Sequence, residues 1–356
     1  MKKHNFGAGP GILPAEAIKR SGEALVNFNG SGLSILEISH RSKDFEAVLQ
    51  HAKALVKELL QVPDTHSILF LQGGASTQFA MVPMNLLPAN GTAAYVDSGV
   101  WAAKAVKEAK MMGNTVVVAS SKDKNYSYIP KGFSIPDDSA YLHITSNNTI
   151  YGTQMHGFPK SKVPVVCDMS SDIFSKPVNV AEFDLIYAGA QKNMGPAGVT
   201  LVIVKNECLG KSGRTIPTML NYQTHIDGDS LYNTPPVFAI YVCMATLDWL
   251  KSIGGVAAIQ KINQKKAELL YAEIDNNPLF TGTCAVEDRS WMNACFLLTK
   301  PEMEESFMSA AKEAGIIGIK GHRSVGGFRA SMYNALPLES VEVLVQVMKE
   351  FALKTA

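Results

Sequence analysis

Two residues in the middle of the sequence could carry out covalent chemistry together. Lys192 lies in the run AGAQKN, and no other charged residue occurs between Asp184 and Lys205. Removing an ammonium group from water costs several kcal/mol or more unless the charge is paired or removed. A lysine that forms a Schiff base with a carbonyl cofactor loses its charge by chemistry. The alternative is an ordinary turn lysine between the two strands of a hairpin.

Asp168 favours the chemical interpretation. It follows the apolar run Val163–Cys167, so we expect it at the carboxyl end of a central parallel strand, where open α/β sheets bind their ligands. Pyridoxal phosphate (PLP) requires a lysine for its aldehyde and a carboxylate for its pyridine nitrogen. Lys192 and Asp168 therefore predict a PLP site.

The elements that must position these residues follow from the pattern of apolar residues. Runs of strand length alternate with helical periods, as expected for βαβ units. We predict strands at 68–71, 93–96, 116–119, 141–144 and around Val165, Ile186 and Leu201, with helices at 14–28, 45–60, 100–111, 237–250 and 256–274. Further strands near 292–298 and 328–332 and helices at 302–314 and 338–353 follow.

This order predicts an α/β fold of two domains. Residues 15–255 form a large domain on a mostly parallel seven-stranded sheet, and residues 1–14 and 256–356 form a smaller α+β domain. At 356 residues and 46% hydrophobic content, the chain is too long for a single small core.

Composition excludes several classes of protein. Lys and Arg number 33 against 32 Asp and Glu, so a basic surface for nucleic acid is not expected. The five cysteines lack CxxC spacing, which indicates free thiols in a reducing compartment and no metal site. The basic start is not followed by an apolar segment of a signal peptide, and no apolar run reaches the roughly 18 residues of a membrane span. We therefore predict a cytoplasmic protein without a membrane partner.

A phosphate cradle is predicted at Gln72–Thr77, between a strand and a helix that begins near Ser76. Glycines at 73 and 74 let the backbone approach an anion, and the first N–H groups of a helix lack intrahelical partners. The alternative is an ordinary Ser or Thr N-cap.

Two more residues could contact a cofactor ring. Trp101 follows a strand at the start of a helix, and a flat indole there could stack on a pyridine ring, although it could equally fill a domain interface. Thr149, after the strand 141–144, offers a hydroxyl to the ring oxygen, although Asn-rich loops such as 147–149 are commonly turns.

The chain from Asn5 to Phe351 resembles the phosphoserine aminotransferase family, which comprises fold-type I PLP enzymes among the class V aminotransferases. The likeness rests on these motifs: Gly73-Gly74-Ala75-Ser76, Val100-Trp101, Asn148-Thr149, Cys167-Asp168, Gln191-Lys192, Asn233-Thr234, His322-Arg323 and Gly327-Phe328-Arg329. It implies reversible transamination between phosphoserine plus 2-oxoglutarate and 3-phosphohydroxypyruvate plus glutamate, in serine biosynthesis. Some members act on a phosphorylated hydroxythreonine in pyridoxine biosynthesis. A homodimer with shared active sites is also implied.

The resemblance also implies roles for individual residues. Lys192 matches the residue that bonds the cofactor and moves the substrate's α-proton, Asp168 matches the partner of the pyridine nitrogen, and Trp101 matches the stacking ring. Further cofactor contacts are implied for Ala75, Ser76, Gln191 and Thr149, and for Asn233 and Thr234 from the neighbouring subunit. Several relatives carry arginine in place of Ser76, and some carry serine in place of Ala8.

Substrate recognition requires two separated cationic anchors, because phosphoserine carries a phosphate and a carboxylate. By resemblance, Arg329 holds the α-carboxylate. The implied phosphate anchors are His40, Arg41, His322 and Arg323, the last two reaching in from the other subunit.

Two other functions compete with this one. A cysteine desulfurase or related lyase of the same fold would need a mobile nucleophilic cysteine, for which Cys284 and Cys295 are the candidates. A catalytically inactive PLP-fold module that only binds or regulates is the second alternative.

Overall fold

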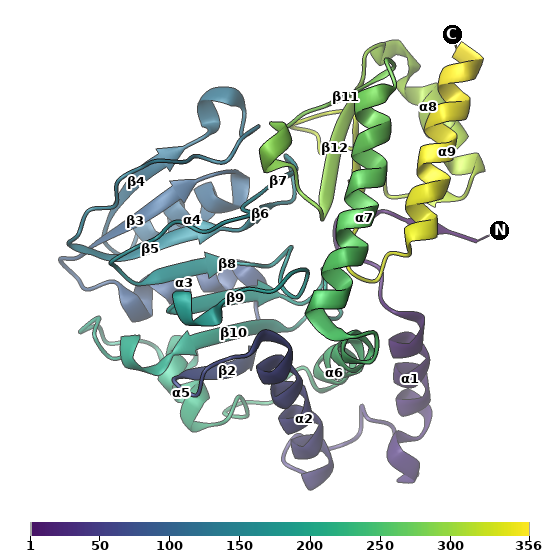
Figure 1. Cartoon of the computed structure of the whole chain (residues 1–356). Coiled ribbons are helices and arrows are strands. Elements are labelled where there is room, and N and C mark those ends of the chain that lie inside the picture. The colour runs from purple at the N-terminus through teal and green to yellow at the C-terminus, as the bar shows by residue number, and fades with distance from the viewer. Residues whose placement is uncertain (1, 356) are drawn as a thin grey trace.

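The computed structural model describes residues 2–355. The largest of its sheets has seven strands (Figure 1). The strand order is β2-β10-β9-β8-β5-β3-β4. Strand β10 is antiparallel to β2 and β9, and the other neighbours run parallel, which confirms the predicted mostly parallel sheet. The strands are β2 (His66–Leu71), β3 (Thr92–Asp97), β4 (Asn114–Ser120), β5 (Ser139–Thr145), β8 (Val165–Asp168), β9 (Leu185–Gly189) and β10 (Thr200–Lys205).

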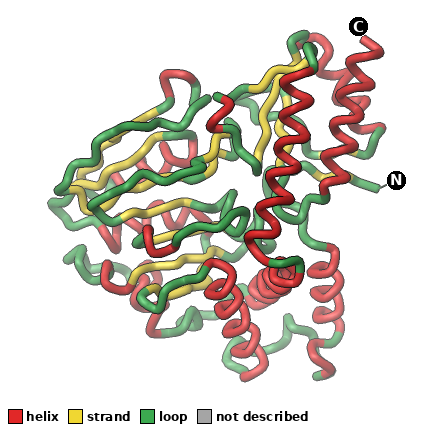
Figure 2. Tube along the Cα trace, in the orientation of Figure 1, coloured by secondary structure: helices red, strands yellow, loops and turns green. Residues whose placement is uncertain are grey.

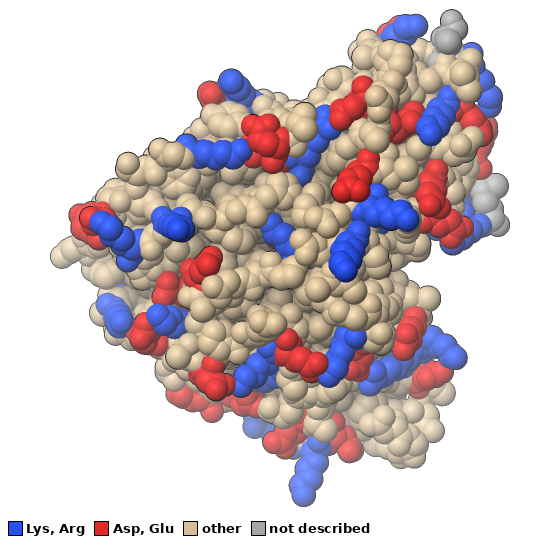
Figure 3. All heavy atoms as spheres, viewed as in Figure 1, with Lys and Arg blue, Asp and Glu red and all other residues tan. Residues whose placement is uncertain are grey.

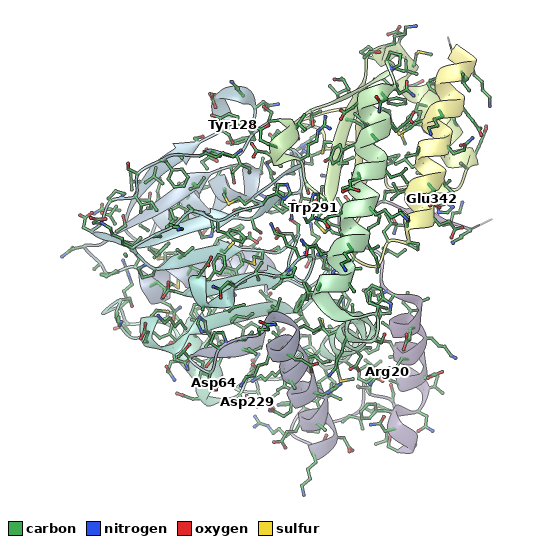
Figure 4. All side chains as sticks on the ribbon, in the orientation of Figure 1. Arg20, Asp64, Tyr128, Asp229, Trp291 and Glu342 are labelled. Carbon is green, nitrogen blue, oxygen red and sulfur yellow. The ribbon has the colours of Figure 1, made fainter. Side chains whose placement is uncertain are left out.

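Helices cover both faces of this sheet. Side chains of a strand alternate between the two faces, so Leu201 and Ile203 join one core cluster while Val202 and Val204 join another. The first cluster includes α2 (Lys43–Leu60) and α6 (Val237–Ser252), and the second includes α3 (Gly74–Leu86) and α4 (Val100–Lys110). Helix α1 (Ala15–Val26), on which Figure 4 labels Arg20, packs on α6. Arg20 forms an ion pair with Asp248 at 2.5 Å.

A smaller unit lies beside the carboxyl ends of the central strands (Figures 1 and 2). Its antiparallel sheet contains β11 (Phe280–Gly282), β12 (Asn293–Leu298) and β14 (Phe328–Ser331), and its helices are α7 (Gly255–Asn276), α8 (Glu304–Glu313) and α9 (Leu338–Thr355). Phe6 joins its core, next to where β1 (His4–Asn5) pairs with β13 (Ile316–Ile317). The domain boundaries at residues 14 and 255 stay predictions.

The long predicted elements occur within a few residues of their expected ends, whereas short ones were missed. Helix α3 begins at Gly74, two residues before the expected Ser76. Helix α5 (Tyr222–Asp227) and strands β6 (Asn147–Asn148) and β7 (Thr153–Gln154) had no prediction. Such short segments carry too few residues for a hydrophobic period to be recognised.

Charge is mixed over the surface, with Lys and Arg interspersed among Asp and Glu on the face shown in Figure 3. The five cysteines are free thiols. Within residues 2–355, no single helix combines the length and apolar character of a membrane span. Helices α6 and α7 meet such a test only when taken together as a pair bent by 81°.

Candidate active site

A cavity of about 260 Å³ lies at the carboxyl ends of β5, β8 and β9 and contains most of the predicted cofactor residues. The N-terminus of α3 and the first turn of α4 complete its wall. Its lining includes Gly73, Gly74, Ala75, Ser76, Trp101, Thr145, Asn147, Thr149, Asp168, Ser170, Ser171, Gly189, Gln191 and Lys192. The position agrees with the rule that open α/β sheets bind ligands beyond the carboxyl ends of their strands.

Asp168 ends β8, the middle strand of the sheet, and is 4% exposed. One carboxylate oxygen accepts a hydrogen bond from the Ser170 N–H at 2.9 Å. The pKa of Asp168 is raised to about 6, mainly because the carboxyl is buried; hydrogen bonds from Ser170 lower the pKa, the nearby Asp172 raises it, and the Lys192 charge lowers it. A cationic ring nitrogen placed here would stabilise the ionised carboxylate.

Lys192 lies in the turn between β9 and β10, which pair antiparallel, so the hairpin interpretation describes its backbone correctly. Its side chain nevertheless lines the cavity and is half-buried. Gly9 packs directly against it, since a Cβ on Gly9 would lie 3.0 Å from Lys192 Cε. The Tyr333 ring centroid is 5.8 Å from Lys192 Nζ. The turn therefore positions an enclosed amine facing a cavity.

The N-terminus of α3 is open to an anion. Gly73 precedes the helix with φ 90°, and no side chain caps its first turn, so the Ser or Thr N-cap alternative is wrong. A Cβ on Gly73 would fall 1.9 Å from Thr77 Oγ1, so only glycine fits. The uncapped N–H groups and the helix dipole favour a phosphate at this wall of the cavity.

Trp101, on α4, and Thr149, directly after β6, both line the cavity. Trp101 is half-buried, and the Lys104 ammonium lies 4.4 Å from its ring centroid. Thr149 is 5% exposed, and its carbonyl oxygen accepts a hydrogen bond from Arg329 Nη1 at 3.3 Å. This hydrogen bond between Arg329 and Thr149 joins the small unit to the cavity wall.

Arg329, His322 and Arg323 gather near one another. Arg329 is on β14, and its Nε is buried without a hydrogen-bond partner. Burial lowers the pKa of His322, and the charges of Arg329 and Arg323 lower it further. Val325, in the same loop, packs in the cluster that contains Trp101. The resemblance implies a partner's loop here, but within one chain this loop already lies beside Arg329.

Seven predicted residues do not line the Lys192 cavity: His322, Arg323 and Arg329, described above, and His40, Arg41, Asn233 and Thr234. His40 and Arg41 precede α2, and His40 Nε2 is buried without a partner. Asn233 lines a neighbouring cavity together with Gln72, and the Thr234 carbonyl accepts a hydrogen bond from Gln72 Nε2 at 3.2 Å.

Thr145 is the main cavity residue that sequence reasoning missed. It ends β5 directly opposite Asp168, and its hydroxyl is buried without a hydrogen-bond partner. The carboxyl-end rule applied to Asp168 could have found it on the neighbouring strand. An unpaired buried hydroxyl on a cavity wall is available to a ligand.

Comparison with known proteins identifies the class. The family model "Aminotransferase class-V" matches residues 4–344. The chain is a class V aminotransferase, and its α/β fold agrees with that class.

Closer relatives narrow this class. The phosphoserine aminotransferase of Flavobacterium johnsoniae is 63% identical over 350 residues, which is 98% of each chain. That of Parabacteroides distasonis is 60% identical over 99% of each chain. The solved phosphoserine aminotransferase from Bacillus circulans subsp. alkalophilus superimposes with a TM-score of 0.97 at 48% identity, covering 100% of this chain and 99% of that one. The chain belongs to the phosphoserine aminotransferase family and is a PLP-dependent enzyme.

The residues present fit PLP. The cavity combines an uncapped helix N-terminus for a phosphate, a buried carboxylate for a ring nitrogen and a half-buried lysine for an aldehyde. The unpaired Thr145 hydroxyl adds a polar group without a protein partner.

Proposed function

We propose that the chain transfers an amino group reversibly between phosphoserine and 2-oxoglutarate, giving 3-phosphohydroxypyruvate and glutamate, as a step of serine biosynthesis. The observation that carries this proposal is that Lys192 and Asp168 line one cavity. Arg329 donates a hydrogen bond to the carbonyl of Thr149, which lines the same cavity. A role in pyridoxine biosynthesis with phosphohydroxythreonine stays a prediction.

The chain's own residues divide the work of cofactor binding. Asp168 holds the ring nitrogen, Thr145 and Thr149 offer hydroxyls, and Trp101 supplies a flat wall that excludes water. The phosphate rests on the N–H groups of the first turn of α3, where Ala75 and Ser76 lie, with Gln191 beside it. Because Ser76 replaces the arginine of several relatives, this subsite depends on backbone, hydroxyl and dipole donors.

Lys192 is the base of the proposed reaction. When bound, PLP holds the amino group and withdraws electrons from the α-carbon. Lys192 Nζ accepts the proton released there and returns it to the neighbouring C4′ position, while Asp168 keeps the ring nitrogen protonated. Gly9 and Tyr333 border the lysine side chain and restrict where its amine can lie.

Arginine anchors select the substrate. The guanidinium of Arg329 can bind the α-carboxylate in bidentate fashion, and its unpaired Nε leaves a donor free for it. His322 and Arg323 hold the distal phosphate, or the distal carboxylate of glutamate. His40 and Arg41 bind the same distal anion.

A homodimer with shared active sites completes the proposal. Apolar side chains lie exposed on α1 and the segment after it, with Val26 81% and Leu36 66% exposed. This segment leads to His40 and Arg41. A second copy that covers this segment would bury apolar area. It would also bring residues such as Asn233 and Thr234 of one subunit to the Lys192 cavity of the other. We further propose that this dimer is cytoplasmic and acts on small molecules alone.

Cysteine chemistry is disfavoured by the two candidate thiols. Burial raises the pKa of Cys284 to about 11, and its thiol donates a hydrogen bond to the Tyr151 carbonyl at 2.7 Å. Cys295 is 2% exposed within β12. A desulfurase needs a mobile thiolate, and neither residue offers one.

A panel of single half-reactions tests the proposed function. Phosphoserine and glutamate should convert the bound cofactor, whereas serine, alanine and cysteine should react at least about 100-fold more slowly, because each lacks a distal anion for charge-assisted hydrogen bonds. Loss of the visible cofactor band measures each rate. Equal rates for serine and phosphoserine would refute the requirement for two anchors.

Arg329→Lys should lower kcat/KM for both phosphoserine and glutamate by roughly 10- to 100-fold, since a lysine cannot form the bidentate contact. Cofactor affinity should not change. Steady-state kinetics measure the effect, with the exposed Lys300→Gln as the matched control. A change of twofold or less in Arg329→Lys would remove this residue from carboxylate binding.

A further inference from the structure

Lys266, on helix α7, is a fully buried cation to which the proposed reaction assigns no task. Its exposure is 0%, and it takes part in none of the ion pairs formed among residues 2–355. Burial lowers its pKa to about 7. A lysine buried without a carboxylate costs stability relative to an apolar residue of the same volume. Its presence therefore calls for a role other than filling space.

The Lys266 ammonium holds one turn of the chain by three carbonyl oxygens. It donates hydrogen bonds to the carbonyls of Met332 (2.9 Å), Tyr333 (2.9 Å) and Leu336 (3.2 Å). An ammonium has three N–H donors, so every donor is used. The turn 332–336 follows β14, the strand that carries Arg329.

The turn 332–336 is also hydrogen-bonded to Asn193, the residue next to Lys192. The Asn334 N–H donates to Asn193 Oδ1 at 3.0 Å, and Asn334 Nδ2 donates to the Phe174 carbonyl at 3.0 Å. Asn263, which precedes Lys266 by one turn of α7, donates to Asn334 Oδ1 at 2.9 Å. Helix α7 thus holds the turn through two side chains, and the turn holds Asn193.

The turn also reaches Lys192 from its other side. Tyr333 donates a hydrogen bond to the Ala8 carbonyl at 2.7 Å, next to Gly9, which packs on the lysine stem. The Gly11 N–H donates to the Gln191 carbonyl at 2.7 Å. A Cβ on Gly11 would lie 2.8 Å from both the Tyr333 ring and the Lys192 carbonyl, so this packing is close.

We propose that Lys266 is a positioning residue for Lys192, acting through the turn 332–336 that it holds against Asn193 and the segment 8–11. A base that both anchors a cofactor and moves a proton must return to one place, and a shift of about 1 Å in such a group can cost about 100-fold in rate. The expected effect on catalysis rests on the proposed function. The effect on the position of the turn 332–336 concerns the cofactor-free protein and does not depend on it.

Lys266→Met tests the inference, because it keeps the stem and removes all three donors. The control is Lys265→Met, an exposed neighbour on the same helix. In the cofactor-free protein, hydrogen–deuterium exchange by mass spectrometry should become at least about tenfold faster for peptides covering 332–336 and 190–196 in Lys266→Met only. In the loaded enzyme, kcat should fall roughly 10- to 100-fold with KM nearly unchanged. The pH midpoint of the cofactor's visible absorbance should also move.

Different failures have different meanings. If wild type does not convert phosphoserine but local exchange and the absorbance midpoint change as expected, the proposed function fails and the positioning role stands. If exchange rises uniformly over the chain, or kcat and the midpoint match the Lys265→Met control, the positioning role is overturned. If Lys266→Met does not fold, Asn263→Leu removes the other side chain of α7 that holds the turn. This variant must then show the same local increase in hydrogen–deuterium exchange.

Discussion

Lys192→Ala should retain the fold and lose turnover by several powers of ten. The side chain lies in a turn and is half-buried, so its removal leaves the sheet and both cores intact. In the proposed reaction the same amine both bonds the cofactor and moves the α-proton, so one substitution removes two catalytic functions, and such losses reach about 10⁴- to 10⁶-fold. Asp168, Trp101 and the cradle of α3 remain, so weak cofactor binding should persist.

Absorbance and kinetics check this result together. Wild type should carry a visible cofactor band that borohydride bleaches with permanent attachment to the protein, and Lys192→Ala should show no such attachment. The exposed Lys211→Ala serves as the control. Substantial residual turnover in Lys192→Ala would refute the assignment. A wild-type chain that never acquires the band would instead favour the inactive binding module.

The sequence predicted those features that depend on local pattern. Strands such as Val165–Asp168 and Thr200–Lys205 are apolar along their whole length because both faces of the sheet are covered, and this makes them recognisable. Asp168 could be placed at a strand end by the same reasoning. Lys192 attracted attention because it is isolated among small residues.

What the sequence could not predict depends on contacts between distant segments. Lys266 occurs in a helix with lysines at 261 and 265 that are exposed, and only the packing of the turn 332–336 against α7 distinguishes it. Likewise, the meeting of Gly9 and Lys192 joins residues far apart in the chain. His40 and Arg41 lie outside the Lys192 cavity of their own chain, and their role as phosphate anchors stays a prediction.

Asp168→Asn should retain the cofactor but lower turnover by about 10³-fold, because a neutral amide cannot hold the ring nitrogen in its protonated form. The Ser170 N–H can still bond to the amide oxygen, so the local structure should persist. Half-reaction rates and the cofactor spectrum measure the effect, with the exposed Asp137→Asn as the control. A rate close to that of wild type would remove Asp168 from this role.

The same substitution should stabilise the protein when it is free of cofactor. The pKa of Asp168 is about 6 in the folded chain, above its ordinary value of 3.8, because its carboxylate is buried. Between these two pH values the folded state holds a proton that the unfolded state has released, so the contribution of Asp168 to stability falls as pH rises from about 4 to 6. At pH 7.5 the cost is fully present, on the order of 1–3 kcal/mol, and Asp168→Asn abolishes it.

Urea unfolding of the cofactor-free proteins at pH 4.5, 6 and 7.5 separates this effect from a general change in packing. The advantage of Asp168→Asn over wild type should be small at pH 4.5 and reach its full size by pH 7.5. An advantage that is independent of pH, or a less stable variant at pH 7.5, would contradict the buried-charge explanation. A cationic ring nitrogen bound beside Asp168 would offset this cost. Adding PLP should therefore stabilise wild type more than Asp168→Asn.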